Sequence, residues 1–140
     1  MKIAINRQYG GFGLSLEGKT ELGKRQGKDI FHYKQTKYGY DNGGVDEYTK
    51  IFDEDSVGIC PYSYSKDFGE TTNELDDAYY FSIPEDRSDK DLVSVIEDMG
   101  EKSFSKYSTL KIVEIPDGIE YEIDDYDGIE TIHECHRSWS

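Results

Sequence analysis

The sequence has little of what marks secreted, membrane-spanning or redox-active proteins. Its only two cysteines, Cys60 and Cys135, do not form a Cys-x-x-Cys pair, and nothing else in the chain indicates an oxidising compartment. The first residues are too polar for a signal peptide. No apolar run approaches the roughly 20 residues that span a bilayer. The sequence therefore predicts a cytoplasmic protein with free thiols and no membrane contact.

Large apolar residues are also scarce, because Leu, Ile, Val and Phe together make up only 30 of the 140 residues while the formal net charge is −14. This combination approaches the composition of disordered proteins. Twelve tyrosines restore apolar surface, since their rings can line a core or a recognition surface. The 13 isoleucines against 6 leucines favour a sheet over a helix bundle. We expect an α+β fold, with a small antiparallel or mixed sheet and about two helices, in a single domain over residues 1–140.

The first half of the chain gives alternating strand and helix signals. Apolar and polar residues alternate over residues 2–6, which predicts a short strand. A glycine-rich turn follows, and Ser15 is placed to cap a helix over residues 16–26. The first half of the stretch from Ile30 to Tyr40, which is rich in aromatic residues and lysine, predicts a second strand. The polar stretch at about residues 41–74 predicts a long loop or insertion.

A second helix is the clearest element of the sequence. Ser88 is placed to cap it in a variant of the capping box, and Gly100 is placed to end it. Before it, residues 77–83 predict a strand that ends at Pro84. The helical spacing predicts a buried stripe that consists of Leu92, Val95, Ile96 and Met99.

The last third of the chain predicts three strands. Residues 110–115 and 119–123 form the arms of an expected hairpin around Pro116-Asp117-Gly118. A third arm over residues 128–135 is expected after a turn at residues 124–127. In the second arm, isoleucine and tyrosine alternate with glutamate, which predicts one apolar and one acidic face.

Charge is unevenly distributed along the chain. Residues 1–50 carry nine Lys and Arg against six Asp and Glu, whereas residues 51–140 carry seven against twenty-four. Residues 112–134 contain nine acids and neither Lys nor Arg. Such a field repels phosphate backbones, so we expect no direct nucleic-acid binding, but it can attract a basic partner. An acidic face that only maintains solubility is the alternative. The candidate partner-binding residues are Asp117, Glu120, Glu122, Asp124, Asp125, Tyr126, Asp127 and Trp139.

Trp139 is the chain's only tryptophan. It either packs back into the core or anchors a partner or a second subunit, because Trp is favoured at interfaces. A homo-oligomer is therefore one of the alternatives.

The glycine-rich turn lies between a strand and a helix, where backbone amides can hold an anion. Leu16 stands where the dinucleotide-binding pattern needs its third glycine, and the Gly-Lys-Ser/Thr of a phosphate loop is missing. A tight turn that requires glycine at positive φ is the alternative interpretation. If the turn binds a nucleotide, the ligand-binding residues are Arg7, Gly10, Gly11, Gly13, His136 and Arg137.

Metal and catalytic signals are weak. His133, Cys135 and His136 lie close together, but zinc sites usually draw spaced pairs of ligands from two elements. The acidic turn at residues 124–128 lacks the spacing of a calcium-binding EF-hand loop. Carboxylates, serines and histidines are abundant without a spacing that selects a base and a nucleophile. We expect no metal, no cofactor and no enzymatic activity.

Three segments carry a further signal. The chain starts with KIAINRQYGGFGLS after Met1, continues after residue 86 with RSDKDLVSVIEDMGEKS, and ends with LKIVEIPDGIEYEIDDYDGIETIHECHRSW before Ser140. These segments resemble a family of small, mostly uncharacterised proteins of bacteriophages and prophages. The resemblance implies a phage protein in the cytoplasm of its host, and it supplies no catalytic residues.

These features favour a phage-encoded, non-enzymatic accessory protein. It would bind and inhibit a host defence or nucleic-acid-processing protein through an acidic, tyrosine-rich surface, as DNA-mimicking inhibitors do. One alternative is a small-ligand or nucleotide-binding protein that sequesters a signal with its glycine-rich loop. A second alternative is a small hydrolase.

Overall fold

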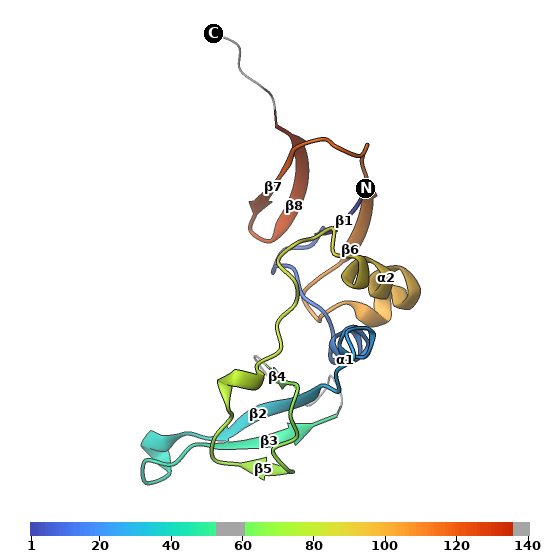
Figure 1. Ribbon diagram of the computed structural model, residues 1–140. Helices are drawn as coiled ribbons and strands as arrows, with labels where there is room; N and C mark the ends of the chain where they lie inside the picture. The colour runs from blue at the N-terminus through green and yellow to red at the C-terminus, as the bar shows by residue number, and fades with distance from the viewer. Residues whose placement is uncertain (53–60, 136–140) are drawn as a thin grey trace. The chain divides into compact units, whose positions relative to one another are not determined.

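A computed structural model describes residues 1–52 and 61–135 (Figure 1). The described residues form two helices and eight strands in small antiparallel sheets, which confirms the expected α+β class. The chain divides into two compact units. Unit 1 combines residues 1–18 with residues 84–140, and unit 2 consists of residues 19–83. Within the described part of the chain, no helix is long and apolar enough to cross a membrane.

Unit 1 is built around strand β1 (Lys2–Asn6), whose Ile3 and Ala4 are fully buried. β1 pairs antiparallel with β6 (Leu110–Glu114), and Figure 1 shows α2 (Lys90–Met99) beside this pair. On the other edge of β1, the Ala4 amide donates a hydrogen bond of 2.9 Å to the Arg87 carbonyl. β1 is therefore covered on both edges and is the centre of the unit 1 core.

The N-cap of helix α2 lies one residue later than expected. Asp89, not Ser88, is the N-cap, and its carboxylate accepts a hydrogen bond from the Leu92 amide at 2.9 Å. The Ser88 hydroxyl instead donates to Asp86. The stripe is nearly as expected, since Leu92, Val95 and Ile96 are buried, but Val93 is buried as well and Met99 only partly. A 3₁₀ turn, η4 (Gly100–Ser103), follows the helix.

The expected hairpin between residues 110–115 and 119–123 is wrong. β7 (Tyr121–Tyr126) pairs with β8 (Ile129–Glu134), while β6 pairs with β1. The turn that closes β7 and β8 is Asp127-Gly128, where φ is 50° and 93°. Two central residues with positive φ suit the twist of a two-residue hairpin, and Asp-Gly is among the sequences that adopt it best. This turn lies later than the turn expected at residues 124–127, and β6 cannot form the expected hairpin because it pairs with β1.

Unit 2 contains a four-stranded antiparallel sheet in the order β4-β2-β3-β5. Its strands are β2 (Phe31–Lys37), β3 (Glu47–Ile51), β4 (Tyr62–Tyr64) and β5 (Thr71–Thr72). The segment expected to be a loop over residues 41–74 thus supplies three strands, although residues 53–60 lie outside the described residues. A 3₁₀ turn, η1 (Gly39–Asp41), connects β2 to β3.

The helix expected after Ser15 is confirmed as α1 (Leu16–Arg25), and the Ser15 hydroxyl accepts the Gly18 amide at 3.0 Å. The strand expected over residues 77–83 is wrong, because this segment starts as a 3₁₀ turn, η3 (Asp77–Tyr79). The Asp76 carboxylate caps that turn by accepting the Ala78 amide. Only an isolated bridge between Tyr80 and Tyr64 has strand geometry.

Candidate protein-binding surface

The β7–β8 hairpin presents one outward face of acidic and aromatic side chains. Along β7, Glu122, Asp124 and Tyr126 alternate with residues of the opposite face, and all three are exposed. Tyr126 is 72% exposed. We call these three residues the acidic face. The hairpin register brings His133 of β8 into its neighbourhood, and the His133 Nε2 lies 2.9 Å from the Asp124 carboxylate.

Two of the other candidate acids serve the hairpin turn. Asp125 lies on the opposite side of β7, and its carboxylate accepts the Gly128 amide at 2.7 Å. Asp127 lies in the turn itself, and its carbonyl accepts the Gly10 amide at 3.1 Å. These two residues shape the tip of the hairpin, Asp125 through its carboxylate and Asp127 through its backbone carbonyl.

The remaining candidates lie at the start of the hairpin or beyond it. The Asp117 carboxylate is 2.7 Å from the N-terminal ammonium group of Met1. Glu120 is exposed, and its carbonyl accepts the Cys135 amide, which extends the pairing past β8. Trp139 lies outside the described residues. The structure therefore brings together Glu122, Asp124 and Tyr126 on one face. The other described candidates lie outside this face.

The inward side of the hairpin borders a small apolar groove, which we call the hairpin groove. It has a volume of about 190 Å³ and lies between the end of β6 and the β7–β8 pair. Its lining residues are Val113, Ile115, Pro116, Ile119, Tyr121, Ile132 and Glu134. The acidic face and the hairpin groove thus occupy opposite sides of one hairpin.

Glu130 anchors the hairpin to the centre of unit 1. Its side chain is only 5% exposed, and its two carboxylate oxygens accept hydrogen bonds from Nη1 and Nη2 of Arg87 at 2.7 and 2.9 Å. The same carboxylate accepts the Asn6 backbone amide at 2.7 Å, and the Arg87 guanidinium lies 3.7 Å from the centre of the Phe12 ring. This anchor could not be predicted from the sequence, because Glu130 is one acid within a long acidic run.

The glycine-rich turn holds the tip of the hairpin. The Gly10 amide is used by the Asp127 carbonyl, and the Asn6 side chain donates to the Gly128 carbonyl at 2.6 Å. A Cβ atom on Gly128 would collide with the Gly10 and Gly11 backbone, so the two glycine turns pack backbone against backbone. The glycine at 128 is therefore needed for close approach as well as for its positive φ.

The residues of the alternative ligand site have mostly intramolecular roles. Arg7 donates to the Glu130 carbonyl at 2.7 Å, and the Gly13 carbonyl accepts the Ser108 hydroxyl at 2.9 Å. Gly11 has open space where a Cβ would lie. His136 and Arg137 lie outside the described residues. The structure brings Arg7 and Gly10 to the hairpin, where they position β8 and its turn.

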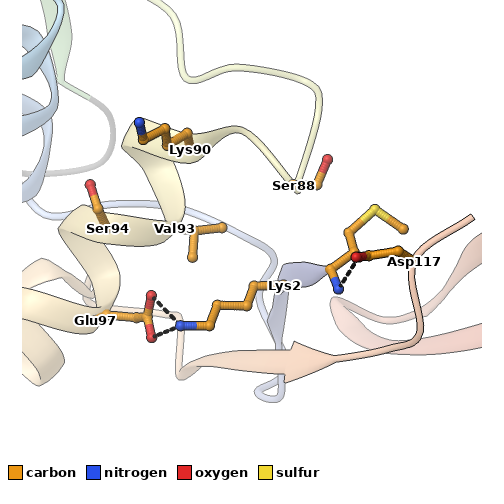
Figure 2. A pocket seen from close by; sticks show the side chains of 8 residues that line it. Lys2, Ser88, Lys90, Val93, Ser94, Glu97 and Asp117 are labelled. Atoms are coloured by element: carbon orange, nitrogen blue, oxygen red, sulfur yellow. Dashed lines mark hydrogen bonds and ion pairs between the residues drawn. The ribbon is translucent and has the colours of Figure 1, made fainter.

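A larger groove of about 460 Å³ lies beside α2 in unit 1. Figure 2 shows the Lys2 side chain extended below Val93 to the Glu97 carboxylate, 2.9 Å away, while the Lys90 ammonium points away from this pair. Asp117 lies at the other end of the groove. Lys2 and Glu97 compensate each other, so the groove does not present a single sign of charge to a ligand.

The described residues offer little support for metal or thiol chemistry. No group of three or more His, Cys, Asp or Glu side chains is arranged to hold a metal ion within residues 1–52 and 61–135. Partial burial raises the pKa of the Cys135 thiol, and the nearby Glu122 carboxylate raises it further. Because the thiolate is the nucleophile, this environment makes Cys135 less reactive.

Most tyrosines lie in unit 2, away from the acidic face in sequence. Tyr33 and Tyr64 are buried, and the Phe68 ring packs edge-on against both at 6.0 and 5.5 Å between ring centres. Burial, followed by the Asp77 charge, raises the pKa of Tyr64 to about 12. These tyrosines form a core, whereas Tyr126 belongs to the candidate binding surface.

Comparison with known proteins gave no matching family, no similar curated protein and no similar solved structure. The candidate surface therefore rests on the residues and geometry of this chain.

Proposed function

We propose that this protein is a non-enzymatic binding protein that engages a basic surface of another protein through its β7–β8 hairpin. The observation that carries the proposal is the acidic face, where Glu122, Asp124 and Tyr126 are exposed together on one strand. The segment that surrounds this face, residues 112–134, has nine acids and neither Lys nor Arg.

The anchoring of the hairpin supports this function. Glu130, Arg87 and Asn6 fix β8, and the glycine-rich turn fixes the tip, so the exposed side chains project from a backbone with many internal bonds. A preorganised surface loses less conformational entropy when it binds. Clustered charge of one sign also increases the rate of encounter with an oppositely charged partner.

The resemblance to small phage proteins supports a partner in the host cell, and inhibition as the outcome of binding. If that partner is a defence or nucleic-acid-processing protein, its basic groove normally contacts phosphates. Carboxylates on a fixed hairpin would then occupy phosphate positions, as in DNA mimicry. Tyr126 would add apolar contact area at the end of the acidic face next to the turn, and aromatic residues are enriched among those that contribute most to binding.

The test is an affinity purification from host cells with a charge-reversed variant. Glu122→Lys combined with Asp124→Lys should lower the recovery of the specific partner by about tenfold or more, because attraction becomes repulsion. Recovery of the same partner by the parent should also fall between about 50 mM and about 500 mM salt, since exposed charges are screened.

The matched control is Asp41→Lys combined with Glu74→Lys, which changes net charge equally at exposed sites in unit 2. This control should retain the partner. If both double variants lose the partner equally, only the overall charge matters. If partner recovery is the same for the parent and both variants and at both salt concentrations, the proposed surface is refuted.

A further inference from the structure

The inward side of the β7–β8 hairpin is incompletely covered by the described part of this chain. Tyr121, Ile123 and Ile132 point to this side and are all only half-buried. Among the described residues, no fully buried apolar side chain comes from β7 or β8, where Glu130 is the only buried residue. A two-stranded hairpin gains stability mainly when its apolar face is covered, so this side can bury more apolar surface.

The size of the hairpin groove restricts what it can hold. Its volume of about 190 Å³ is below the roughly 300–1,000 Å³ typical of sites for drug-sized ligands and cofactors. Six of its seven lining residues are apolar, and the only charged one is Glu134. A groove of this size and lining suits an apolar side chain of a polypeptide better than a whole small molecule.

The charges next to the groove restrict the occupant further. The exposed acids Glu114, Asp117 and Glu120 are each adjacent in sequence to a lining residue, and Glu134 lies in the lining itself. Asp117 is paired with the Met1 ammonium group, and Glu114 lies opposite Lys2 in the register of β1 and β6, so the excess negative charge beside the groove comes from Glu120 and Glu134. An apolar centre with an acidic rim favours a segment that brings both an apolar side chain and cations, and it rejects acidic segments by repulsion.

We propose that the hairpin groove binds a basic segment of a partner protein, with one bulky apolar side chain in the groove and Lys or Arg on either side of it. This inference rests on the proposed binding function and specifies how the partner is recognised. The acidic face attracts the partner, and the groove selects the sequence that docks.

A display library of random peptides tests the sequence preference directly. The library is selected on the parent protein and counter-selected on the Ile119→Ser variant. Ile119 lies before β7, so this change leaves the β7–β8 pairing in place. The surviving peptides should share a bulky apolar residue flanked by Lys or Arg. Survivors without an apolar centre, or no survivors, would overturn the proposal.

Binding of one selected peptide, measured by fluorescence anisotropy, separates the groove from the acidic face. Replacing the apolar centre of the peptide with Ser should weaken binding to the parent about tenfold or more. This preference should vanish with Ile119→Ser and with Ile132→Ser, and it should persist in the Glu122→Lys, Asp124→Lys double variant. A preference that survives both groove variants overturns the groove, while the charge-dependent recovery of a host protein would still stand.

Two further measurements test the two other possible occupants of the groove. If removing residues 136–140 changes the amide NMR signals of Ile119 and Ile132 and strengthens peptide binding, the groove belongs to the chain's own end. If the parent is a dimer that Ile119→Ser converts to a monomer, the groove holds a second copy. Either result overturns the partner segment, and unchanged signals in a monomeric parent support it.

Discussion

At the scale of single residues, Glu130 shows how one acid differs from its neighbours through its partners. It lies among exposed acids, yet its carboxylate binds Arg87 and the Asn6 amide in a buried position. A buried carboxylate without partners would be strongly disfavoured. Arg87 therefore makes it possible for β8 to carry an acid on its inward side, and the pair connects segments distant in the sequence.

Removing the Glu130 carboxylate should be costly, because it leaves the Arg87 guanidinium without its main partner. We expect Glu130→Ala to lower the free energy of unfolding by about 3–5 kcal/mol, measured by urea denaturation. The control is Glu21→Ala, which breaks a more exposed ion pair with Arg25 and should cost about 1 kcal/mol or less. Similar losses in both variants would show that Glu130 is not an anchor.

The raised pKa of Tyr64 predicts that the protein loses stability at alkaline pH. Its pKa is about 12 in the folded protein against an ordinary value of 10.0, so the unfolded chain releases the phenolic proton first. Stability is therefore fully present below pH 10 and falls as the pH rises from 10 to 12. Thermal unfolding across this range should show a shallower decline for Tyr64→Phe than for the parent. Tyr40→Phe, whose side chain is 84% exposed, should follow the parent, and identical slopes in all three proteins would contradict the prediction.

At the scale of elements, substitutions at the N-cap of α2 test where the helix begins. Asp89→Ala removes the hydrogen bond to the Leu92 amide and should cost about 1 kcal/mol. Ser88→Ala should change the free energy of unfolding by less than about 0.5 kcal/mol, because the Ser88 hydroxyl contacts Asp86 outside the helix. The reverse order of effects in chemical denaturation would restore Ser88 as the cap.

Elements with strong local signals could be predicted from the sequence. The alternation in β1, the Ser15 cap of α1 and the stripe of α2 were all visible, because each depends on neighbours within a few residues. Pairing partners were not visible. β6 joins β1, more than 100 residues away, and no local pattern distinguishes that pairing from a hairpin with β7.

Only the acidic composition of the candidate surface could be predicted from the sequence. The acidic run identified Glu122 and Asp124, but assigning them to one face required the β7–β8 register. Asp125 and Glu130 belong to the opposite side, where they bind Gly128 and Arg87. The short strands β4 and β5 were missed because their polar sequence resembles a loop, and pairing with their neighbours decides their conformation.

At the scale of the whole molecule, charge follows the fold more closely than it follows the two halves of the sequence. Unit 1, which joins both ends of the chain, contains eight Lys and Arg against seventeen Asp and Glu. Unit 2 contains eight against thirteen. The larger acidic excess thus belongs to the unit that carries the hairpin. Two basic residues of unit 1, Arg7 and Arg87, are directed to Glu130, which leaves the outward carboxylates without those cations.

The division into two units predicts that each can lose stability by itself, whereas the sequence led us to expect a single domain. Ile96→Ala removes buried side-chain atoms from unit 1, and Ile51→Ala does so in unit 2. Each change should cost about 2–4 kcal/mol where its side chain is buried. Hydrogen exchange of the native protein, measured in increasing denaturant, reads out the two units separately.

Ile96→Ala should lower the exchange protection of β1 and β6 while β2 and β3 keep theirs, and Ile51→Ala should do the reverse. If either change lowers protection equally in all four strands, the chain unfolds as one cooperative domain. Separate responses would mean that the hairpin depends on the unit 1 core alone, because its anchors Asn6, Arg87 and Glu130 all lie in that unit. The binding surface would then remain intact in an Ile51→Ala protein whose sheet in unit 2 is destabilised, and partner recovery by that variant should equal recovery by the parent.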